Sequence, residues 1–188
     1  MFSPLVDSAE IRGWATLSGD DTERPFEHTV GRACTFFSYS DYTALFLPET
    51  IRGACAWSAG NDSRPFAMFF TIPDPADYWA NAGSFGGLVA TGTDDPGAIE
   101  SFLMQDDRAG PSLSPYDTSH RFIILPDDRS WMWIGDRDAD LAIFGFTTEG
   151  LQRQFVSGAG FRMFASLDEA ASHAKSFMNY SVDKACLS

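Results

Sequence analysis

The stretch Arg121–Phe146 has the sequence RFIILPDDRSWMWIGDRDADLAIFGF. Three apolar blocks, Arg121–Leu125, Trp131–Ile134 and Leu141–Phe146, are separated by two short polar segments rich in aspartate. Short apolar blocks bounded by proline, glycine and aspartate are typical of strands joined by turns. We therefore expect a three-stranded meander, with PDDRS and GDRDAD as its two turns.

The first two blocks are almost continuously apolar, which favours central strands covered on both faces. Because successive side chains of a strand point to opposite faces, Trp131 and Trp133 should lie on one side of the sheet and Met132 and Ile134 on the other. The two turns should leave opposite ends of the middle strand, about 15 Å apart at roughly 3.3 Å per residue. Two separate acidic rims are therefore expected.

Other short apolar segments predict the rest of the sheet. They are rich in aromatic residues and bounded by Pro, Gly, Asn or Asp, which favours strands. These segments are Ala33–Tyr39, Ala44–Leu47, Ala54–Trp57, Phe66–Ile72 and Phe161–Ala165. Residues 1–30 are mostly polar, but Ile11, Trp14 and Leu17 are spaced for one helical face. A short, loosely packed helix followed by a loop is expected there.

Two helix starts pair an aspartate with a proline, at Asp74-Pro75 and Asp95-Pro96. Aspartate caps free N–H groups, and proline in the first helical turn loses no hydrogen bond. The second of these helices should bury Ile99, Phe102 and Leu103.

A third start precedes the last helix, expected over Leu167–Tyr180, where Ser166 and Glu169 match the S-x-x-E capping box. Its buried stripe should be Ala170, Ala174, Phe177 and Met178. With 188 residues, the chain is long enough for one well-packed core. We therefore predict a single α+β domain over residues 1–188. Its mainly antiparallel mixed sheet of about six to eight short strands should be packed by two or three helices, with the C-terminal helix last.

The chain is strongly acidic, with a net charge of −13. Residues 94–149 hold 12 acidic against 4 basic residues. This charge repels phosphate backbones and argues against nucleic-acid binding. It favours a basic protein surface or a cation as partner, although solubility alone would also explain it.

The remaining composition points to the cytoplasm. No apolar run approaches the roughly 20 residues of a membrane-spanning helix, and the first residues carry no secretory signal. Cys34, Cys55 and Cys186 form neither a C-x-x-C pair nor a zinc spacing, so reduced thiols are expected. Only Lys175 and Lys184 stand against 11 arginines, a bias associated with GC-rich bacterial genomes.

The D-x-D-x-D pattern of Asp136, Asp138 and Asp140 is the opening ligand spacing of an EF-hand loop. The sixth position is Leu141 rather than glycine, and the twelfth is Thr147 rather than glutamate. In water, alternate carboxylates about 6.6 Å apart repel by only about 0.6 kcal/mol. We therefore expect a solvated turn, with a cation or basic-partner site as the alternative.

No catalytic motif stands out. The histidines His28, His120 and His173 are scattered and match no metal motif. His120 borders the meander and is the candidate general base, with an ordinary polar role as the alternative. The nucleophile motif G-x-S-x-G and the phosphate-binding glycine motifs are absent. No cofactor is therefore predicted.

The segment 106–119 is a predicted surface loop, and its length makes it a candidate rim of a binding site, with Tyr116 within it. Aromatic residues could also line a ligand pocket or anchor a protein interface, but core packing is the favoured interpretation for each of them. These residues are Trp57, Tyr78, Trp79, Tyr116, Trp131 and Trp133.

Two functions follow. The favoured one is a protein-binding module that engages a basic partner surface, as inhibitors and immunity-type proteins do. The alternative is a small-molecule-binding domain, or an enzyme whose site is assembled from distant residues. The candidate binding residues are Asp127, Asp128, Arg129, Asp136, Asp138, Asp140, Tyr116 and His120.

Overall fold

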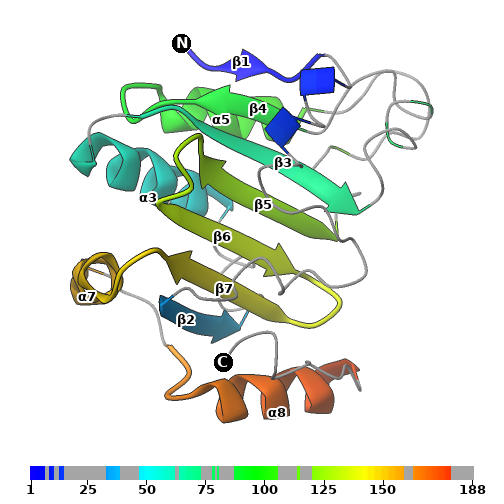
Figure 1. The fold of residues 1–188 in the computed structure, drawn as a ribbon. Helices are drawn as coiled ribbons and strands as arrows, with labels where there is room; N and C mark the ends of the chain where they lie inside the picture. Colours follow the sequence, from blue (N-terminus) through cyan, green and yellow to red (C-terminus); the bar gives the residue numbers. More distant parts are fainter. Residues whose placement is uncertain are drawn as a thin grey trace.

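The computed structural model describes residues 1–6, 9–10, 13–14, 33–38, 47–61, 64–72, 78, 80, 87–105, 114, 120–158 and 163–178. Within these residues, seven strands form one antiparallel sheet in the order β1-β4-β3-β5-β6-β7-β2 (Figure 1). The strands are β1 (Ser3–Pro4), β2 (Ala33–Ser38), β3 (Phe66–Ile72), β4 (Gly87–Ala90), β5 (Arg121–Pro126), β6 (Trp131–Asp136) and β7 (Leu141–Phe146). The helices are α3 (Leu47–Gly60), α5 (Pro96–Leu103), α7 (Glu149–Gly158) and α8 (Leu167–Met178). The predicted α+β class, with the C-terminal helix last, is confirmed.

The meander β5–β6–β7 forms as predicted, and none of its three strands is an edge strand of the sheet. Ile123 pairs with Ile134 between β5 and β6, and Trp133 pairs with Phe144 between β6 and β7. Every residue of these three strands is buried. Both faces are therefore covered, as the unbroken apolar blocks indicated.

The two faces of β6 enter different cores. Trp131 and Trp133 lie in a cluster that also holds residues of α3 and α5, with Phe155 of α7 packed against it. Met132 and Ile134 lie in the cluster that contains Ala170 and Ala174 of α8. The predicted alternation of side chains along this strand is confirmed.

The predicted strand Ala54–Trp57 is wrong, because these residues lie inside helix α3. Ile51, Ala54, Cys55 and Ser58 are buried, and their spacing of three and four residues is helical. A four-residue apolar run does not distinguish a strand from a buried helical turn. Of the predicted strand Ala44–Leu47, only Leu47 is described, and it begins α3.

Helix α7 was not predicted from the sequence. Its first turn is capped by Thr148, whose Oγ1 accepts a hydrogen bond from the N–H of Leu151 at 3.2 Å. The segment is mostly polar, and its apolar residues Leu151, Phe155 and Val156 are only partly buried. A helix that buries so narrow an apolar stripe gives a weak periodic pattern.

The predicted starts of helices α5 and α8 are confirmed. Asp95 caps α5 by accepting from the N–H of Gly97 at 3.0 Å, with Pro96 in the first turn. Ser166 Oγ accepts from the N–H of Glu169 at 3.2 Å, and the Glu169 carboxylate accepts from the N–H of Ala165 at 2.7 Å. The capping box therefore forms, with the glutamate reaching one residue beyond its usual partner.

Several predictions fall partly or wholly outside the described residues. Of the helix expected after Asp74-Pro75, only Tyr78 and Ala80 are described, and both are helical. Of the N-terminal helical face, Trp14 alone is described. Within the predicted strand Phe161–Ala165, Met163 forms a single bridge, and the N–H of Phe164 donates to the carbonyl of Phe36 at 2.9 Å. Among the described helices, none has both the length and the apolar character needed to span a membrane.

Candidate functional site

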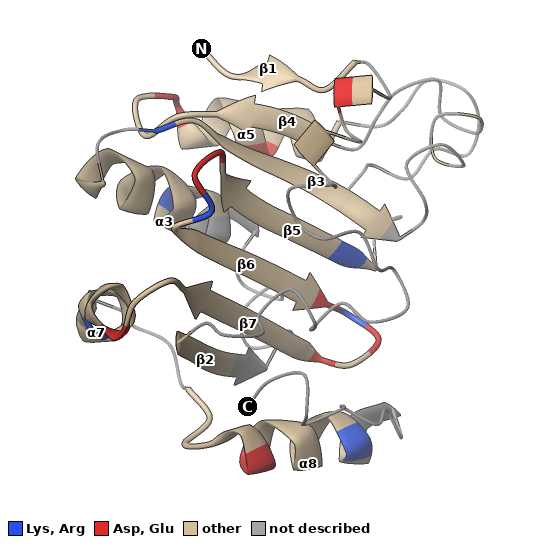
Figure 2. Ribbon diagram, viewed as in Figure 1, with Lys and Arg blue, Asp and Glu red and all other residues tan. Residues whose placement is uncertain are grey.

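The two acidic turns lie at opposite ends of β6 (Figure 2), as the meander predicted. The turn between β6 and β7 carries Asp138 and Asp140 directly after Asp136, and the turn between β5 and β6 carries Asp127 and Asp128. The candidate carboxylates therefore belong to two separate sites.

Asp136, at the end of β6 that leads into the β6–β7 turn, forms a buried ion pair with Arg121. The Nη2 and Nε atoms of Arg121 lie 2.6 and 2.8 Å from Asp136 Oδ2. The other carboxylate oxygen, Oδ1, accepts from the N–H of Ala139 at 3.0 Å. Antiparallel pairing places Arg121 directly opposite Asp136, so the register itself brings the two charges together. A buried pair with both oxygens engaged is a structural arrangement rather than a ligand site.

The other two aspartates of this turn each have a histidine partner. His120 Nδ1 lies 2.9 Å from Asp138 Oδ1 in an exposed pair, and His173 Nε2 of α8 lies 2.6 Å from Asp140 Oδ2. Asp136 and Asp140 are 1% and 2% exposed. The expected solvated turn is therefore wrong for these two residues, because a short strand connection packed under α8 and closed by basic partners keeps water out.

The three carboxylates point to three different basic side chains, and no metal cluster forms from them. Across the part of the chain that the structure describes, no group of three or more His, Cys, Asp and Glu residues is placed to hold a metal ion. His120 is bound to an exposed carboxylate at the start of β5, so its role as a general base stays a prediction.

A partly open cavity of about 260 Å³ lies at the other end of β6. Its lining is mainly polar and comes from the end of α3, the segment before β3, the β5–β6 turn and the start of α7. The lining residues that bear on its chemistry are Ser58, Asn61, Arg64, Asp128, Ser130 and Trp131. We call this the hairpin cavity.

Asp128 is held in place in this cavity by its own turn. Its Oδ1 accepts from the N–H of Ser130 at 2.9 Å, and its Oδ2 lies 2.9 Å from Nη1 of Arg64. The turn closes with the N–H of Arg129 donating to the carbonyl of Pro126 at 3.1 Å, and Arg129 has a positive φ of 56°. The turn therefore presents the Asp128 carboxylate in a fixed direction, partly open to solvent.

Ser58 connects the segment before β3, which lines the cavity, to the β4–α5 turn. Its buried hydroxyl donates to the carbonyl of Arg64 at 2.6 Å and accepts from the N–H of Gly92 at 3.1 Å. The C-terminal end of α3 is closed by Asn61, which donates from its backbone to Ser58 and from its side chain to Trp57. The backbone beneath Arg64 is thus fixed, while its side chain is 48% exposed.

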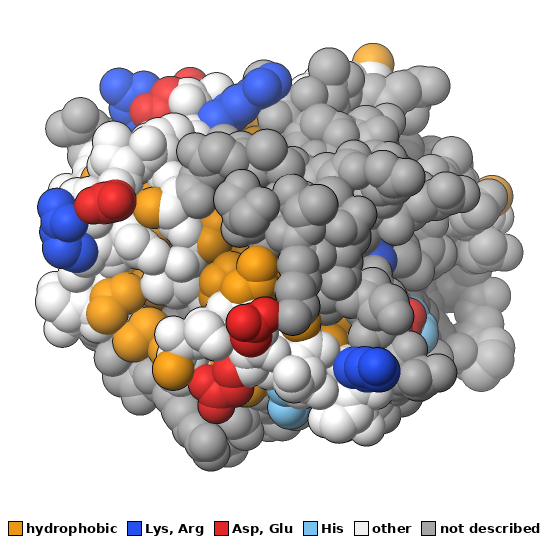
Figure 3. All heavy atoms as spheres, turned by 60° about the horizontal axis from the view of Figure 1, so that its bottom comes forward, with side chains coloured by type: hydrophobic (Ala, Val, Ile, Leu, Met, Phe, Trp, Pro, Cys, Tyr) orange, Lys and Arg blue, Asp and Glu red, His pale blue; other side chains and the backbone are white. Residues whose placement is uncertain are grey.

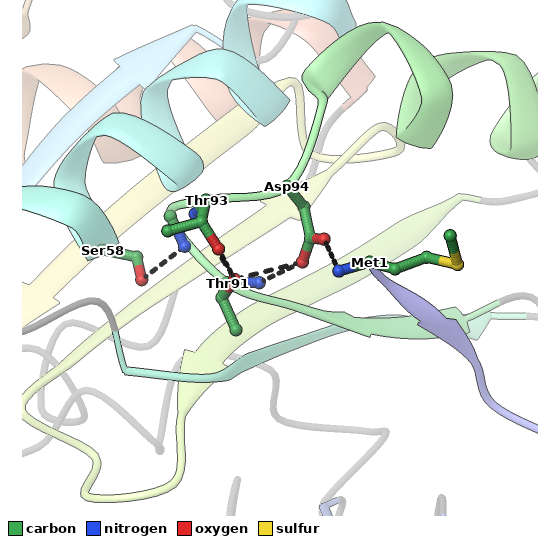
Figure 4. Close-up of polar contacts among 6 residues, drawn as sticks. Met1, Ser58, Thr91, Thr93 and Asp94 are labelled. Atoms are coloured by element: carbon green, nitrogen blue, oxygen red, sulfur yellow. Dashed lines mark hydrogen bonds and ion pairs between the residues drawn. The ribbon is translucent and has the colours of Figure 1, made fainter.

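A third polar cluster joins the N-terminus to the β4–α5 turn (Figure 4). Asp94 Oδ1 lies 2.5 Å from the amino group of Met1, and its Oδ2 accepts from the N–H of Thr91 at 2.8 Å. Burial alone would raise the pKa of Asp94, but the hydrogen bonds from Met1 and Thr91 outweigh it and hold the pKa below its ordinary value. Both oxygens are engaged, so this cluster has a structural role.

Burial removes several carboxylates from the acidic surface that the sequence suggested. Asp94, Asp136 and Asp140 of the block 94–149 are buried. On the face that carries α8, acidic, basic and apolar side chains are interspersed (Figure 3). On this face, the described acidic side chains therefore do not form one continuous patch.

The aromatic residues that are described favour the core interpretation. Trp131, Trp133 and Tyr78 are buried, and the rings of Trp131 and Trp133 are 5.1 Å apart. Trp131 alone among them also lines the hairpin cavity. Tyr116 lies outside the described residues.

Cys55 is a buried thiol rather than a reactive one. Burial raises its pKa to about 11, and the nearby carboxylates of Asp94 and Asp95 add to the effect. Neither Cys55 nor Cys34 forms a disulfide bond. A thiol with so high a pKa is a poor nucleophile at neutral pH.

Of the candidate binding residues named from the turn Asp127–Arg129, only Asp128 lines the hairpin cavity, and Ser58, Asn61 and Arg64 were not found from the sequence. Ser58 and Asn61 follow directly or closely after the part of α3 that was predicted as a strand, and Arg64 precedes β3, so no local pattern placed them near the turn. Comparisons with protein-family models, with curated proteins and with solved structures found no match for this chain.

Proposed function

We propose that this chain is a protein-binding domain that engages a basic surface on a partner, as inhibitors and immunity-type proteins do. The observation that carries the proposal is the hairpin cavity, which has the Asp128 carboxylate in its lining and the exposed Asp127 beside it. A net charge of −13 attracts a basic partner before contact.

The size of the cavity supports a protein ligand over a cofactor-sized molecule. At about 260 Å³ it is smaller than the roughly 300–1,000 Å³ of most small-molecule sites. Such a volume suits one side chain of a partner whose remaining contacts lie on the surrounding surface. Interfaces of this kind depend on a few anchoring residues seated in pockets.

The setting of the proposed interaction is the cytoplasm of a bacterium. The two described cysteines, Cys34 and Cys55, are not joined in disulfide bonds, which is consistent with a reducing compartment. The excess of arginine over lysine is the compositional reason for a bacterial source.

Affinity capture from a bacterial lysate at two ionic strengths tests the proposal. The bait is the chain itself, compared with a variant carrying Asp127→Asn and Asp128→Asn. At about 0.01 M ionic strength, where the Debye length is about 30 Å, a basic partner should be retained, and at about 0.15 M, where it is about 8 Å, retention should fall. The captured partner is then purified and its affinity for both baits measured by calorimetry. Binding that is equally tight for both baits, or independent of salt, contradicts the proposal.

A further inference from the structure

We propose that the hairpin cavity is the anchor site for one arginine side chain of the partner. In the absence of the partner, Arg64 forms the ion pair with the Asp128 carboxylate in its place. This inference rests on the proposed function, because it names the chemistry by which the same site holds a basic surface. It follows from the acceptor, the walls and the resident cation of the cavity.

The acceptor is Asp128, and its present partner is weakly held. The Asp128 and Arg64 side chains are 31% and 48% exposed, with 2.9 Å between Oδ2 and Nη1. Exposed pairs of this kind shift an equilibrium by no more than about fivefold. The hydrogen bond from the N–H of Ser130 to Oδ1 keeps the carboxylate oriented when Arg64 leaves. The carboxylate is therefore preorganised, and an incoming guanidinium can replace the resident one.

The cavity lining favours a planar cation. Gly60 and Asn61 bring the C-terminal end of α3 to the cavity, and that end of a helix carries partial negative charge. The last turn of α3 contains no basic residue to neutralise it. Trp131 lines the cavity but is only 2% exposed, so the choice between cations depends on the carboxylate. A guanidinium group binds carboxylates through a rigid fork of donors, which a lysine ammonium does less well.

Arg64 is placed so that its side chain can move while its backbone stays. The hydroxyl of Ser58 is buried and donates to the carbonyl of Arg64, and the next residue begins the approach to β3. Exchange of one guanidinium for another therefore needs rotation of an exposed side chain and no change in the sheet. The molecule closes its own site with the group that it recognises in a partner.

Nuclear magnetic resonance titration of the full chain with N-acetyl-arginine-methylamide tests the inference directly. The matched neutral probe is N-acetyl-citrulline-methylamide, which has nearly the same shape without the charge. The arginine probe should shift the amide signals of Ser130 and Asn61 in a saturable manner, and the citrulline probe should leave them in place. Lysine in the same blocked form should bind more weakly than arginine.

Two variants with matched controls separate the roles of the charges. Asp128→Asn should reduce affinity for the arginine probe at least about tenfold, whereas Asp168→Asn, an equal change in charge on α8 outside the cavity lining, should change it less than about twofold. Arg64→Ala should raise affinity about two- to fivefold, because the resident competitor is removed. Lys175→Ala, an equal change in charge on α8, should have no such effect. Circular dichroism confirms that each variant is folded.

The outcomes distinguish this inference from the proposed function. Equal shifts with the arginine and citrulline probes, or weaker arginine binding by Arg64→Ala, overturn the arginine site. Shifts produced by acetate that disappear in Arg64→Ala would assign the cavity to an anion and overturn it as well. If the arginine probe behaves as expected but no basic partner is captured from lysate, the anchor chemistry stands and the proposed function fails.

Discussion

The register of β5 and β6 places Arg121 opposite Asp136, and the two charged side chains form a buried ion pair rather than a surface site. Both side chains are buried, with 2.6 Å between Arg121 Nη2 and Asp136 Oδ2. Two charges buried this way contribute little net stability together, but removal of either one leaves the other without compensation. The pair is therefore far more sensitive to a single substitution than to a double one.

We predict that Arg121→Met lowers the free energy of unfolding by about 3–5 kcal/mol, measured by urea denaturation. Arg153→Ala, which removes the exposed pair with Glu149 in α7, should cost less than about 0.5 kcal/mol. Adding Asp136→Leu to Arg121→Met should restore part of the loss, because no unpaired buried charge then remains. Similar costs for Arg121→Met and Arg153→Ala would contradict the structural role of the pair.

Gly92 shows a constraint of packing alone. A Cβ atom at this position would lie 2.3 Å from the backbone nitrogen of Ala59, where the β4–α5 turn contacts the last turn of α3. Backbone cannot move aside as a flexible side chain can, so the two segments must separate.

We predict that Gly92→Ala lowers the free energy of unfolding by about 1–3 kcal/mol. The control is Gly150→Ala in α7, where the nearest atom is 3.7 Å away and alanine should add up to about 1 kcal/mol by helix propensity. Urea midpoints of the two variants should thus move in opposite directions. A stabilising Gly92→Ala would mean that α3 and the turn are not in contact in solution.

Among the elements of the fold, helix α8 depends on the hydroxyl of Ser166 for the stability of its first turn. Ser166 caps it through the N–H of Glu169, whereas Ser172 in the middle donates back to the carbonyl of Asp168 at 2.7 Å. A cap satisfies an otherwise free donor, while a mid-helix serine only competes with the helical hydrogen bond.

We predict that Ser166→Ala costs about 1 kcal/mol of unfolding free energy, and that Ser172→Ala is neutral or stabilising by up to about 0.5 kcal/mol. Thermal unfolding followed by circular dichroism gives both values. The same substitution in one helix should therefore have opposite consequences. Equal losses of unfolding free energy for Ser166→Ala and Ser172→Ala would show that the capping position gives Ser166 no additional stabilising effect.

The β4–α5 turn is an element whose stability should depend on pH. The pKa of Asp94 is held below its ordinary value of 3.8, so the carboxylate contributes stability that is fully present above that pH. This contribution is lost as the pH falls through the lower pKa of the folded state.

We predict that Asp94→Asn is less stable than the unsubstituted chain at pH 7, and that the difference shrinks below about pH 4 as Asp94 becomes protonated. Urea unfolding at a series of pH values measures the difference. Asp95→Asn is the control for the loss of a neighbouring negative charge at pH 7, since asparagine also caps helices. A difference that stays constant down to about pH 2 would rule out the titration of Asp94 as its cause.

The elements that the sequence predicted best are those with the strongest local pattern. Unbroken apolar blocks predicted β5, β6 and β7, and cap residues predicted α5 and α8. Helix α3 was predicted wrongly because its apolar positions are small, Ala54 and Cys55 among them, and small residues mark a helical face weakly. Helix α7 was missed because its apolar stripe is narrow and only partly buried.

At the scale of the whole molecule, the turns were predictable and the site was not. The separation of the two acidic turns follows from strand geometry alone. The partners of those turns come from far along the chain: Arg64 for Asp128 and His173 for Asp140. Such contacts depend on the order of strands in the sheet and on the packing of α3 and α8, which no local pattern encodes.

The strand order also predicts how stability is distributed. Strand β6 is paired on both sides and covered on both faces, while β1 is a two-residue edge strand paired to β4 alone. Opening of the molecule should therefore begin at the β1 edge and reach β6 only in global unfolding.

We predict that the amides of β6 exchange with deuterium at the rate set by global unfolding, while the amide of Leu5 exchanges roughly a hundredfold faster or more. Leu5 is a stringent probe, because its side chain is 1% exposed and its N–H donates to the carbonyl of Gly87 at 2.8 Å. Burial and hydrogen bonding of this one residue are thus equal to those in the centre, and only its place in the sheet differs. If Leu5 exchanges as slowly as β6, the sheet opens as one unit and the edge has no separate stability. If it exchanges faster, strand order rather than local burial governs which part of the molecule opens first.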